Sequence, residues 1–146
     1  MTSCFFSIIL ISRAEFAAIC ARFDERAASG EESFTDIETH WAKQDIIKAS
    51  ENGWILGYPD KTFRPNAFIT RGEAMAMVNR VLNRNPESKE DLWKEMKEWP
   101  DNQEIGKWYY LDVQEATNSH TYERKNNARE YWTTIVLSPD WAGMQE

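Results

Sequence analysis

The sequence predicts a helical domain made of repeated helix–turn–helix units. Two similar segments, Ile-Ser-Arg-Ala-Glu at 11–15 and Ile-Thr-Arg-Gly-Glu at 69–73, each have the residue pattern of a helix start. Apolar residues recur at helical spacing after both segments. A proline-containing turn, Tyr-Pro-Asp-Lys at 58–61, separates two of the helical patterns. These three features favour a helical repeat protein over a sheet protein.

The first predicted helix covers residues 11–24. Ser12 and Glu15 have the spacing of a capping box, in which the Ser hydroxyl accepts a hydrogen bond from the N3 amide and the Glu carboxylate accepts one from the N-cap amide. Residues 25–33 are polar and predict a loop. The helix is predicted to bury one apolar face, which carries Phe16, Ile19, Cys20 and Phe23.

An apolar run extends from Cys4 to Ile11. It lacks the basic start and the small-residue cleavage site of a signal peptide, and it is too short to span a bilayer. We expect it to pack on the domain; an aberrant start on a truncated chain is the alternative. The two cysteines, Cys4 and Cys20, are too few for a disulfide framework. We therefore expect free, buried thiols, with a single bridge as the alternative.

The central segment contains the most complete helix–turn–helix pattern. Thr39 is predicted to cap a helix that ends at Asn52-Gly53, where glycine adopts the left-handed conformation cheaply. Thr70 and Glu73 form a second capping box, and the helix that follows runs to about Leu82. The first of these helices is predicted to bury its apolar residues, Trp41, Ala42, Ile46, Ile47 and Ala49.

The C-terminal part has a weaker pattern. Residues 83–96 are charged and predict a loop with at most one helical turn. A helix is predicted over 108–118, with Trp108 in the core and His120 as a structural or surface residue near its end. The tail from Glu123 mixes charge with aromatic residues, Trp132 and Trp141 among them, so we expect part of it to pack and its last residues to fray.

Composition excludes several classes of function. Aromatic residues make up 13% of the chain, which is more than a disordered protein carries. The net charge of −7 argues against nucleic acid or an anionic membrane as the main partner. His40 and His120 are the only histidines and give no zinc-site spacing, and the turn around Asp60 does not match an EF-hand loop. We therefore expect no metal, no cofactor and no membrane insertion.

Internal repetition is the most informative feature of the chain. Aligning the two helix starts matches identical residues at five positions, namely Ile11 with Ile69, Arg13 with Arg71, Glu15 with Glu73, Ala18 with Ala76 and Arg22 with Arg80. Aligning Trp41 with Trp108 also matches Asp45 with Asp112 and Ala49 with Ala116. Upstream, Phe34-Thr-Asp36 is similar to Trp99-Pro-Asp101. Each unit is too small to bury its own apolar face, so the units must pack together.

Residues 34–82 resemble an S-layer homology domain. The matching elements are Phe34-Thr-Asp36, His40-Trp41-Ala42, Ile46, Ala49, Gly53, Gly57-Tyr-Pro-Asp60, Thr62-Phe63-Arg64-Pro65 and Ile69-Thr-Arg-Gly-Glu73. Residues 11–24 resemble the end of a preceding repeat, and 99–122 resemble a divergent last repeat. The resemblance implies one domain over 1–146, with a partial first repeat at 1–30, a complete second repeat at 33–84, a divergent third repeat at 97–135 and a tail at 136–146.

The family resemblance implies both a fold and a function. The fold is an all-α, pseudo-threefold prism of helix–turn–helix repeats, here incomplete at the N-terminus. Grooves between the repeats bind secondary cell-wall polysaccharide, often through a pyruvylated amino sugar. Binding anchors surface proteins noncovalently to the cell wall, so the resemblance implies an extracellular, cell-surface protein. It implies nothing about the oligomeric state.

The resemblance implies that Arg71, and Arg13 in the partial repeat, contact the glycan. A guanidinium at a helix start can pair bidentately with a carboxylate such as a pyruvate ketal; the alternative is an exposed salt bridge of little energetic value. Trp54 and Tyr58, on the loop, are the candidates for stacking on a sugar. Ser12, Glu15, Thr70 and Glu73 are assigned structural capping roles rather than paired catalytic ones.

Two residues depart from the family pattern. Gly72 replaces the usual alanine and is expected to cost about 0.5–1 kcal/mol of helix stability. Lys61 stands where glycine is common, so it must either adopt a left-handed φ or form a different turn. The third repeat lacks an equivalent arginine, which limits the arginine grooves to two.

The sequence predicts a binding module and not an enzyme, because no nucleophile–base pair or metal cluster is evident. Two alternatives remain. The chain could be a fragment of a cell-wall hydrolase, or a structural or protein-interaction module whose grooves are degenerate.

Overall fold

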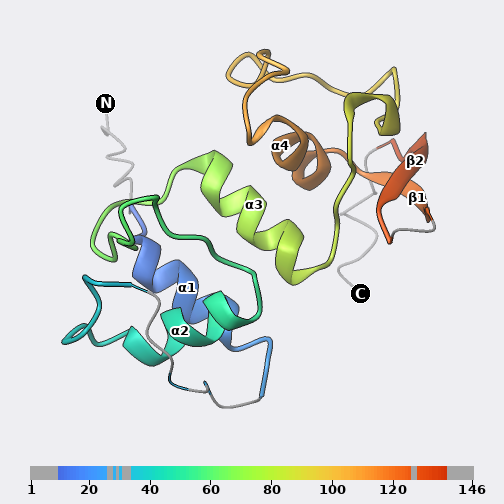
Figure 1. Ribbon diagram of the computed structural model, residues 1–146. Helices are drawn as coiled ribbons and strands as arrows, with labels where there is room; N and C mark the ends of the chain where they lie inside the picture. The colour runs from blue at the N-terminus through green and yellow to red at the C-terminus, as the bar shows by residue number, and fades with distance from the viewer. Residues whose placement is uncertain (1–9, 26–27, 29, 31–33, 126–127, 138–146) are drawn as a thin grey trace, which may run out of the picture. The chain divides into compact units, whose positions relative to one another are not determined.

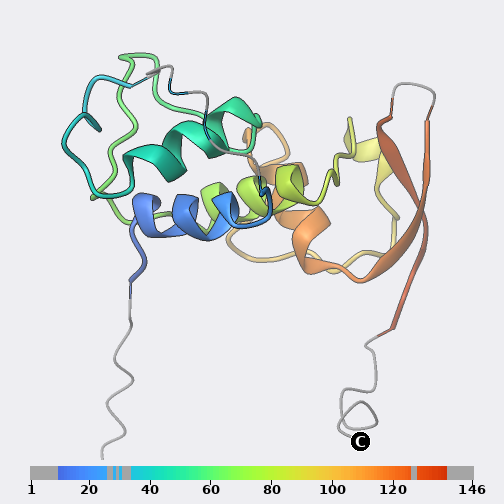
Figure 2. The same ribbon diagram turned by 90° about the horizontal axis from the view of Figure 1, so that it is seen from below.

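The computed structural model describes residues 10–25, 28, 30, 34–125 and 128–137. The chain divides into two compact units, Met1–Thr70 and Arg71–Glu146. Figures 1 and 2 show the helices and strands in chain order. Cys4, most of the predicted apolar N-terminal run and Trp141 lie outside the described residues. Among the described residues, none of the helices combines the length and the apolar character that crossing a membrane requires.

In the first unit, helix α1 (Arg13–Ala21) lies beside helix α2 (Lys43–Glu51) (Figures 1 and 2). Both hydrogen bonds of the predicted capping box are present at the start of α1. The backbone N–H of Glu15 donates to Ser12 Oγ at 3.2 Å, and the backbone N–H of Ser12 donates to Glu15 Oε2 at 2.7 Å. These bonds satisfy amides that have no partner within the helix.

Helix α1 buries small side chains instead of the predicted large ones. Ile19 is 47% exposed and Phe23 is 68% exposed, whereas Cys20 is buried as predicted. Cys20 is a free thiol, and its burial raises the pKa to about 11. Helical spacing identified an apolar face, but close packing favoured an adjacent face made of small residues, which is formed by Ala14, Ala17, Cys20 and Ala21.

Helix α2 starts later than predicted. Ala42 occupies the N-cap position and Thr39 lies in a preceding turn, so the predicted capping role of Thr39 is wrong. The backbone N–H of Ala42 donates to the His40 ring at 3.2 Å instead. The predicted end is confirmed by Gly53, which has a φ of +69°. The predicted burial is also confirmed for most of the apolar set, namely Ala42, Ile46, Ile47 and Ala49.

The predicted core positions of Trp41 and Trp108 are wrong. Trp41 is 67% exposed and Trp108 is 61% exposed. Each residue precedes its helix instead of lying on the buried face, because α2 begins at Lys43 and α4 begins at Tyr110. Trp41 lines an open hollow of about 380 Å³ beside apolar residues of α1.

In the second unit, helix α3 (Arg71–Val81) begins directly after Thr70 and lies beside helix α4 (Tyr110–Thr117) (Figures 1 and 2). The buried Asn79 side chain joins the two helices, since its Nδ2 donates to the Asp112 carbonyl at 2.9 Å. A single 3-10 turn, η1 (Lys89–Asp91), is the one helical turn that the sequence allowed within 83–96.

A two-stranded sheet makes the all-α prediction wrong. Strand β1 (His120–Arg124) pairs antiparallel with β2 (Glu130–Ile135), with an irregularity between Thr121 and Tyr122. His120 therefore belongs to a strand and not to a helix end. Segment 131–135, Tyr-Trp-Thr-Thr-Ile, consists of aromatic and β-branched residues that suit a pleated, half-buried surface. Trp132 anchors β2 in a core with Leu92 and Tyr110.

Candidate functional site

The candidate site lies in the second unit, at the start of α3. Arg71 is the first residue of α3, and 36% of its side chain is exposed. Its guanidinium Nη1 forms an ion pair with Asp101 Oδ2, whose side chain is 60% exposed. The hydrogen bond from Arg71 is the largest cause that lowers the pKa of Asp101 below its usual value. Arg71 thus offers a carboxylate-binding group at the protein surface.

An indole lies next to this guanidinium. The Trp99 ring centroid is 5.3 Å from Arg71 Cζ and 4.0 Å from Lys97 Nζ. The Trp99 Nε1–H donates to Thr117 Oγ1 at 2.8 Å, which holds the ring in place at the end of α4. The site therefore combines two cations with a half-buried aromatic ring, a composition that suits an anionic ligand with an apolar face.

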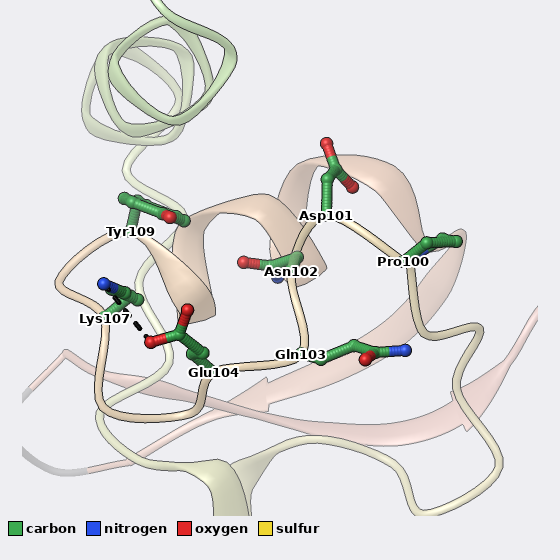
Figure 3. A pocket seen from close by; sticks show the side chains of 7 residues that line it. All are labelled: Pro100, Asp101, Asn102, Gln103, Glu104, Lys107 and Tyr109. Atoms are coloured by element: carbon green, nitrogen blue, oxygen red, sulfur yellow. Dashed lines mark ion pairs between the residues drawn. The ribbon is translucent and has the colours of Figure 1, made fainter.

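A polar hollow of about 150 Å³ adjoins Asp101 (Figure 3). Lys107 Nζ pairs with Glu104 Oε2 at 3.2 Å on one side of it. Asn102 is buried and donates through Nδ2 to the Tyr110 carbonyl at 3.0 Å. The hollow is lined by one proline, one aromatic ring and five hydrogen-bonding side chains, namely Pro100, Tyr109, Asp101, Asn102, Gln103, Glu104 and Lys107.

Arg13, the equivalent of Arg71 in the first unit, is buried and only 4% exposed. Its Nε donates to the Phe63 carbonyl at 2.9 Å and its Nη2 donates to the Leu56 carbonyl at 3.2 Å. Its Cζ also lies 4.7 Å from the Phe63 ring centroid. Arg13 therefore ties α1 to the turn segment that follows α2.

Trp54 and Tyr58 are both half-buried in the first unit. The Tyr58 ring centroid lies 5.0 Å from Arg13 Cζ and 3.8 Å from Arg64 Cζ. The structure thus brings Tyr58 and Arg13 together, whereas Arg71 belongs to the second unit.

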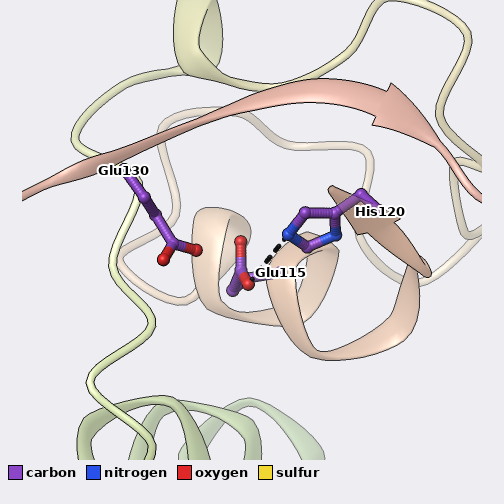
Figure 4. A group of neighbouring side chains, drawn as sticks. All are labelled: Glu115, His120 and Glu130. Atoms are coloured by element: carbon purple, nitrogen blue, oxygen red, sulfur yellow. Dashed lines mark ion pairs between the residues drawn. The ribbon is translucent and has the colours of Figure 1, made fainter. Parts of the chain in front are cut away.

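A buried charged cluster lies between α4 and the hairpin (Figure 4). Ligand atoms of Glu115, His120 and Glu130 lie within 4.8 Å of one another. Arg84 supplies the counter-charge: its Nη2 lies 2.7 Å from Glu115 Oε1 and its Nε lies 3.0 Å from Glu130 Oε1. The guanidinium therefore pairs with both of the buried carboxylates that could otherwise serve as metal ligands.

Further contacts make this cluster part of the core. The Trp132 Nε1–H donates to Glu115 Oε2 at 2.7 Å, and the His120 ring stacks on Trp132 with 3.9 Å between centroids. Burial and the nearby Glu115 carboxylate raise the pKa of Glu130. Burial opposes ionisation of Glu115, but hydrogen bonds from His120 and Trp132 outweigh it and lower its pKa. The network joins the hairpin to α4.

Residues 33–75 match the family model of the S-layer homology domain. This chain carries an S-layer homology domain. The matched segment includes α2, the turn that Arg13 supports and the start of α3 with Arg71.

The chain is similar in sequence to several surface proteins. It is 38% identical over 126 residues to the cellulosome-anchoring protein of Acetivibrio thermocellus, covering 82% of this chain and 27% of that protein. It is 34% identical over 124 residues to cell surface glycoprotein 1 of the same organism, covering 77% of this chain and 5% of that protein. An endoglucanase of a Bacillus species is 28% identical over 141 residues, covering 90% of this chain and 15% of the enzyme. None of the solved structures matches the chain significantly.

Reasoning from sequence missed two residues that the structure places beside Arg71, namely Trp99 and Asp101. A signal for them was present, because Trp99-Pro-Asp101 aligns with Phe34-Thr-Asp36 in the repeat. The alignment identified a structural equivalence but gave no reason to place these side chains beside Arg71. The buried cluster around Arg84 was also missed, since its residues are scattered over positions 84–130 without a recognisable spacing.

Proposed function

We propose that this S-layer homology domain anchors the protein that carries it noncovalently to the cell wall, at the cell surface. Its ligand is an acidic secondary wall polysaccharide, such as one that carries a pyruvylated amino sugar. The observation that supports this most directly is Arg71, an exposed guanidinium beside an indole in a chain similar to a cellulosome-anchoring protein. The role is that of a binding module and not of an enzyme.

Arg71 is the leading ligand contact in this proposal. Its side chain is accessible, and its counter-ion is an exposed carboxylate that a ligand carboxylate can replace. Arg13 was predicted to share this role, but its burial and its bonds to backbone carbonyls favour a structural role instead. Trp54 and Tyr58 are half-buried, so each keeps some surface for a sugar ring in the first unit. Thr70 and Glu73 keep their proposed role as the cap of α3.

The proposal keeps the organisation into repeats at 1–30, 33–84 and 97–135, with a tail at 136–146. The helix pairing supports it: α1 lies beside α2, and α3 lies beside α4. Each compact unit thus joins the arginine-bearing helix of one proposed repeat to the first helix of the next. A groove between repeats would then be a surface within one unit, as the site at Arg71 is.

The test is retention on isolated cell-wall sacculi, either intact or stripped of their secondary polysaccharide. We expect retention on the intact sacculi only. Arg71→Ala should weaken binding about tenfold or more, because hydrogen bonds to charged groups contribute about 1.5–3 kcal/mol. The matched control is Lys89→Ala, which removes another exposed cation paired with a carboxylate.

Four outcomes would count against the proposal. Equal retention on stripped sacculi would exclude the polysaccharide as the ligand. Unchanged binding by a folded Arg71→Ala variant would exclude the site. Release of sugars from the wall by the chain alone would favour the hydrolase alternative, and a calorimetric titration with purified polysaccharide that shows no heat would favour a protein-interaction module.

A further inference from the structure

The two arginines at equivalent positions have different partners. In the first unit, Asp36 accepts hydrogen bonds from the backbone N–H groups of Phe63 and Arg64, both at 2.8 Å. Arg13 donates to carbonyls of the same turn, those of Leu56 and Phe63. The turn therefore satisfies both the carboxylate and the guanidinium.

In the second unit the corresponding residues, Arg71 and Asp101, bond to each other. The described residues of this unit contain a β-hairpin after α4 and no turn in the place of the 56–64 segment. The guanidinium is held by a carboxylate that remains 60% exposed, instead of by buried backbone carbonyls. Such an exposed ion pair contributes little stability and exchanges readily with solvent.

We infer that Asp101 is an internal competitor for the ligand, occupying the Arg71 guanidinium until a carboxylate of the glycan displaces it. This inference rests on the proposed function and concerns the specificity of the same site. A neutral sugar brings no charge to replace that of Asp101. An acidic sugar brings a carboxylate that can take its place. The ion pair therefore lowers the affinity for acidic glycans and leaves the affinity for neutral ones unchanged, so it sets how strongly the site prefers an acidic ligand.

Displacement leaves the Asp101 carboxylate beside the incoming anion. The neighbouring cations soften that repulsion: Lys97 lies over the Trp99 ring, and Lys107 pairs with Glu104 in the adjoining hollow. Removing the charge of Asp101 while keeping its shape should relieve both the competition and the repulsion. Asp101 is thus a specificity-determining residue that does not itself need to touch the glycan.

The experiment is calorimetric titration of wild type and Asp101→Asn with two probes. One probe is the methyl glycoside of an N-acetylhexosamine carrying a pyruvate ketal, and the other is the same glycoside without the ketal. We expect Asp101→Asn to bind the acidic probe about two- to fivefold more tightly, the range that an exposed ion pair contributes. Affinity for the neutral probe should not change. Asp101→Ser should shift affinity in the same direction.

Glu98→Gln is the matched control, since it removes one charge from another exposed ion pair of the second unit. If it tightens binding as much as Asp101→Asn, the effect is one of net charge and the inference is wrong. If wild type binds the acidic probe and Asp101→Asn binds it equally or more weakly, the inference fails while the proposed function stands. If neither protein binds the acidic probe, both fail.

Discussion

Gly72, the second residue of α3, faces the ring of Tyr109. A Cβ at this glycine would lie 2.8 Å from Tyr109 Cγ and 2.9 Å from Tyr109 Cβ, closer than real contacts allow. The sequence suggested that Gly72 only weakens its helix. In the structure the absence of a side chain lets the aromatic ring approach the backbone of α3, so the glycine serves the packing of the second unit.

We predict that Gly72→Ala destabilises the protein. The gain in helix propensity is about 1 kcal/mol, whereas overpacking costs about 1–3 kcal/mol, so a net loss of up to about 2 kcal/mol is expected. Urea unfolding followed by tryptophan fluorescence measures it. Gly106→Ala is the control, because a Cβ there would meet nothing within 4 Å. A Gly72→Ala variant more stable than wild type would contradict the prediction.

Arg13 and Arg71 should respond differently to lysine. A lysine cannot reproduce the two directed bonds of Arg13 to buried carbonyls, so Arg13→Lys should cost about 1–3 kcal/mol of unfolding free energy. Arg71→Lys removes an exposed group and should change stability by less than about 0.5 kcal/mol. Thermal unfolding of the two variants side by side tests this difference, and equal losses would refute it.

Lys61 adopts a φ of +61°, the left-handed option that the sequence left open. Its carbonyl accepts a hydrogen bond from the backbone N–H of Thr35 at 3.0 Å, which fixes the conformation. Because a left-handed non-glycine residue costs about 1–2 kcal/mol and glycine adds some unfolded-state entropy, Lys61→Gly should stabilise by about 0.5–1 kcal/mol. Lys94→Gly, at an exposed residue without positive φ, should give no such gain in melting temperature.

The Arg84 cluster should be sensitive to loss of its cation. The Glu115 and Glu130 side chains are 1% and 0% exposed, so Arg84→Met leaves two carboxyl groups buried without their partner. We expect a loss of about 3–5 kcal/mol in urea unfolding. Adding Glu130→Gln to Arg84→Met should recover part of the loss. Lys89→Met, which breaks an exposed pair with Glu98, should cost less than about 1 kcal/mol.

The lowered pKa of Asp91 predicts that the stability of the protein depends on pH. Burial raises its pKa, but the hydrogen bond from Lys125 Nζ at 2.6 Å and those from the amides of Glu87 and Ser88 outweigh burial, so the pKa lies below 3.8. A carboxyl with a lowered folded-state pKa stabilises the protein above its unfolded pKa, and this contribution is lost as pH falls through the folded value.

Asp91→Asn should therefore be less stable than wild type at pH 7, and the difference should shrink progressively below about pH 3.8. Unfolding free energies measured by urea titration between pH 7 and pH 2 test this. Glu98→Gln, at an exposed pair, should show little difference from wild type across the range. A difference for Asp91→Asn that stays constant with pH would rule out the ionic explanation.

Local chemistry predicted the helices better than their buried faces. The capping box at Ser12, the glycine stop at Gly53 and the start of α3 after Thr70 depend on residues close in sequence. Which side of α1 is buried depends on how closely its partner approaches. Packing selected a face of small residues there, and apolar spacing alone could not choose between two adjacent stripes.

The β-hairpin could not be predicted from local sequence alone. Segment 131–135 has strand-forming residues, but its pairing with β1 and its anchor on Leu92 and Tyr110 are tertiary contacts. The candidate site was only partly predictable, because it too depends on a tertiary contact. The repeat identified Arg71, whereas its pairing with Asp101 is a tertiary contact between residues 30 positions apart.

The match to the S-layer homology family runs from 33 to 75, and it crosses the division between the compact units at Thr70 and Arg71. The segment that sequence comparison recognises is therefore not one of the two compact units of the structure. A peptide of 33–75 alone would contain α2 without α1 and one turn of α3 without α4, so each interface would lack half of its surface. A duplicated copy of such a segment would carry one partner of the α1–α2 interface and one partner of the α3–α4 interface. It could therefore bury its apolar surfaces only against the segments that precede and follow it.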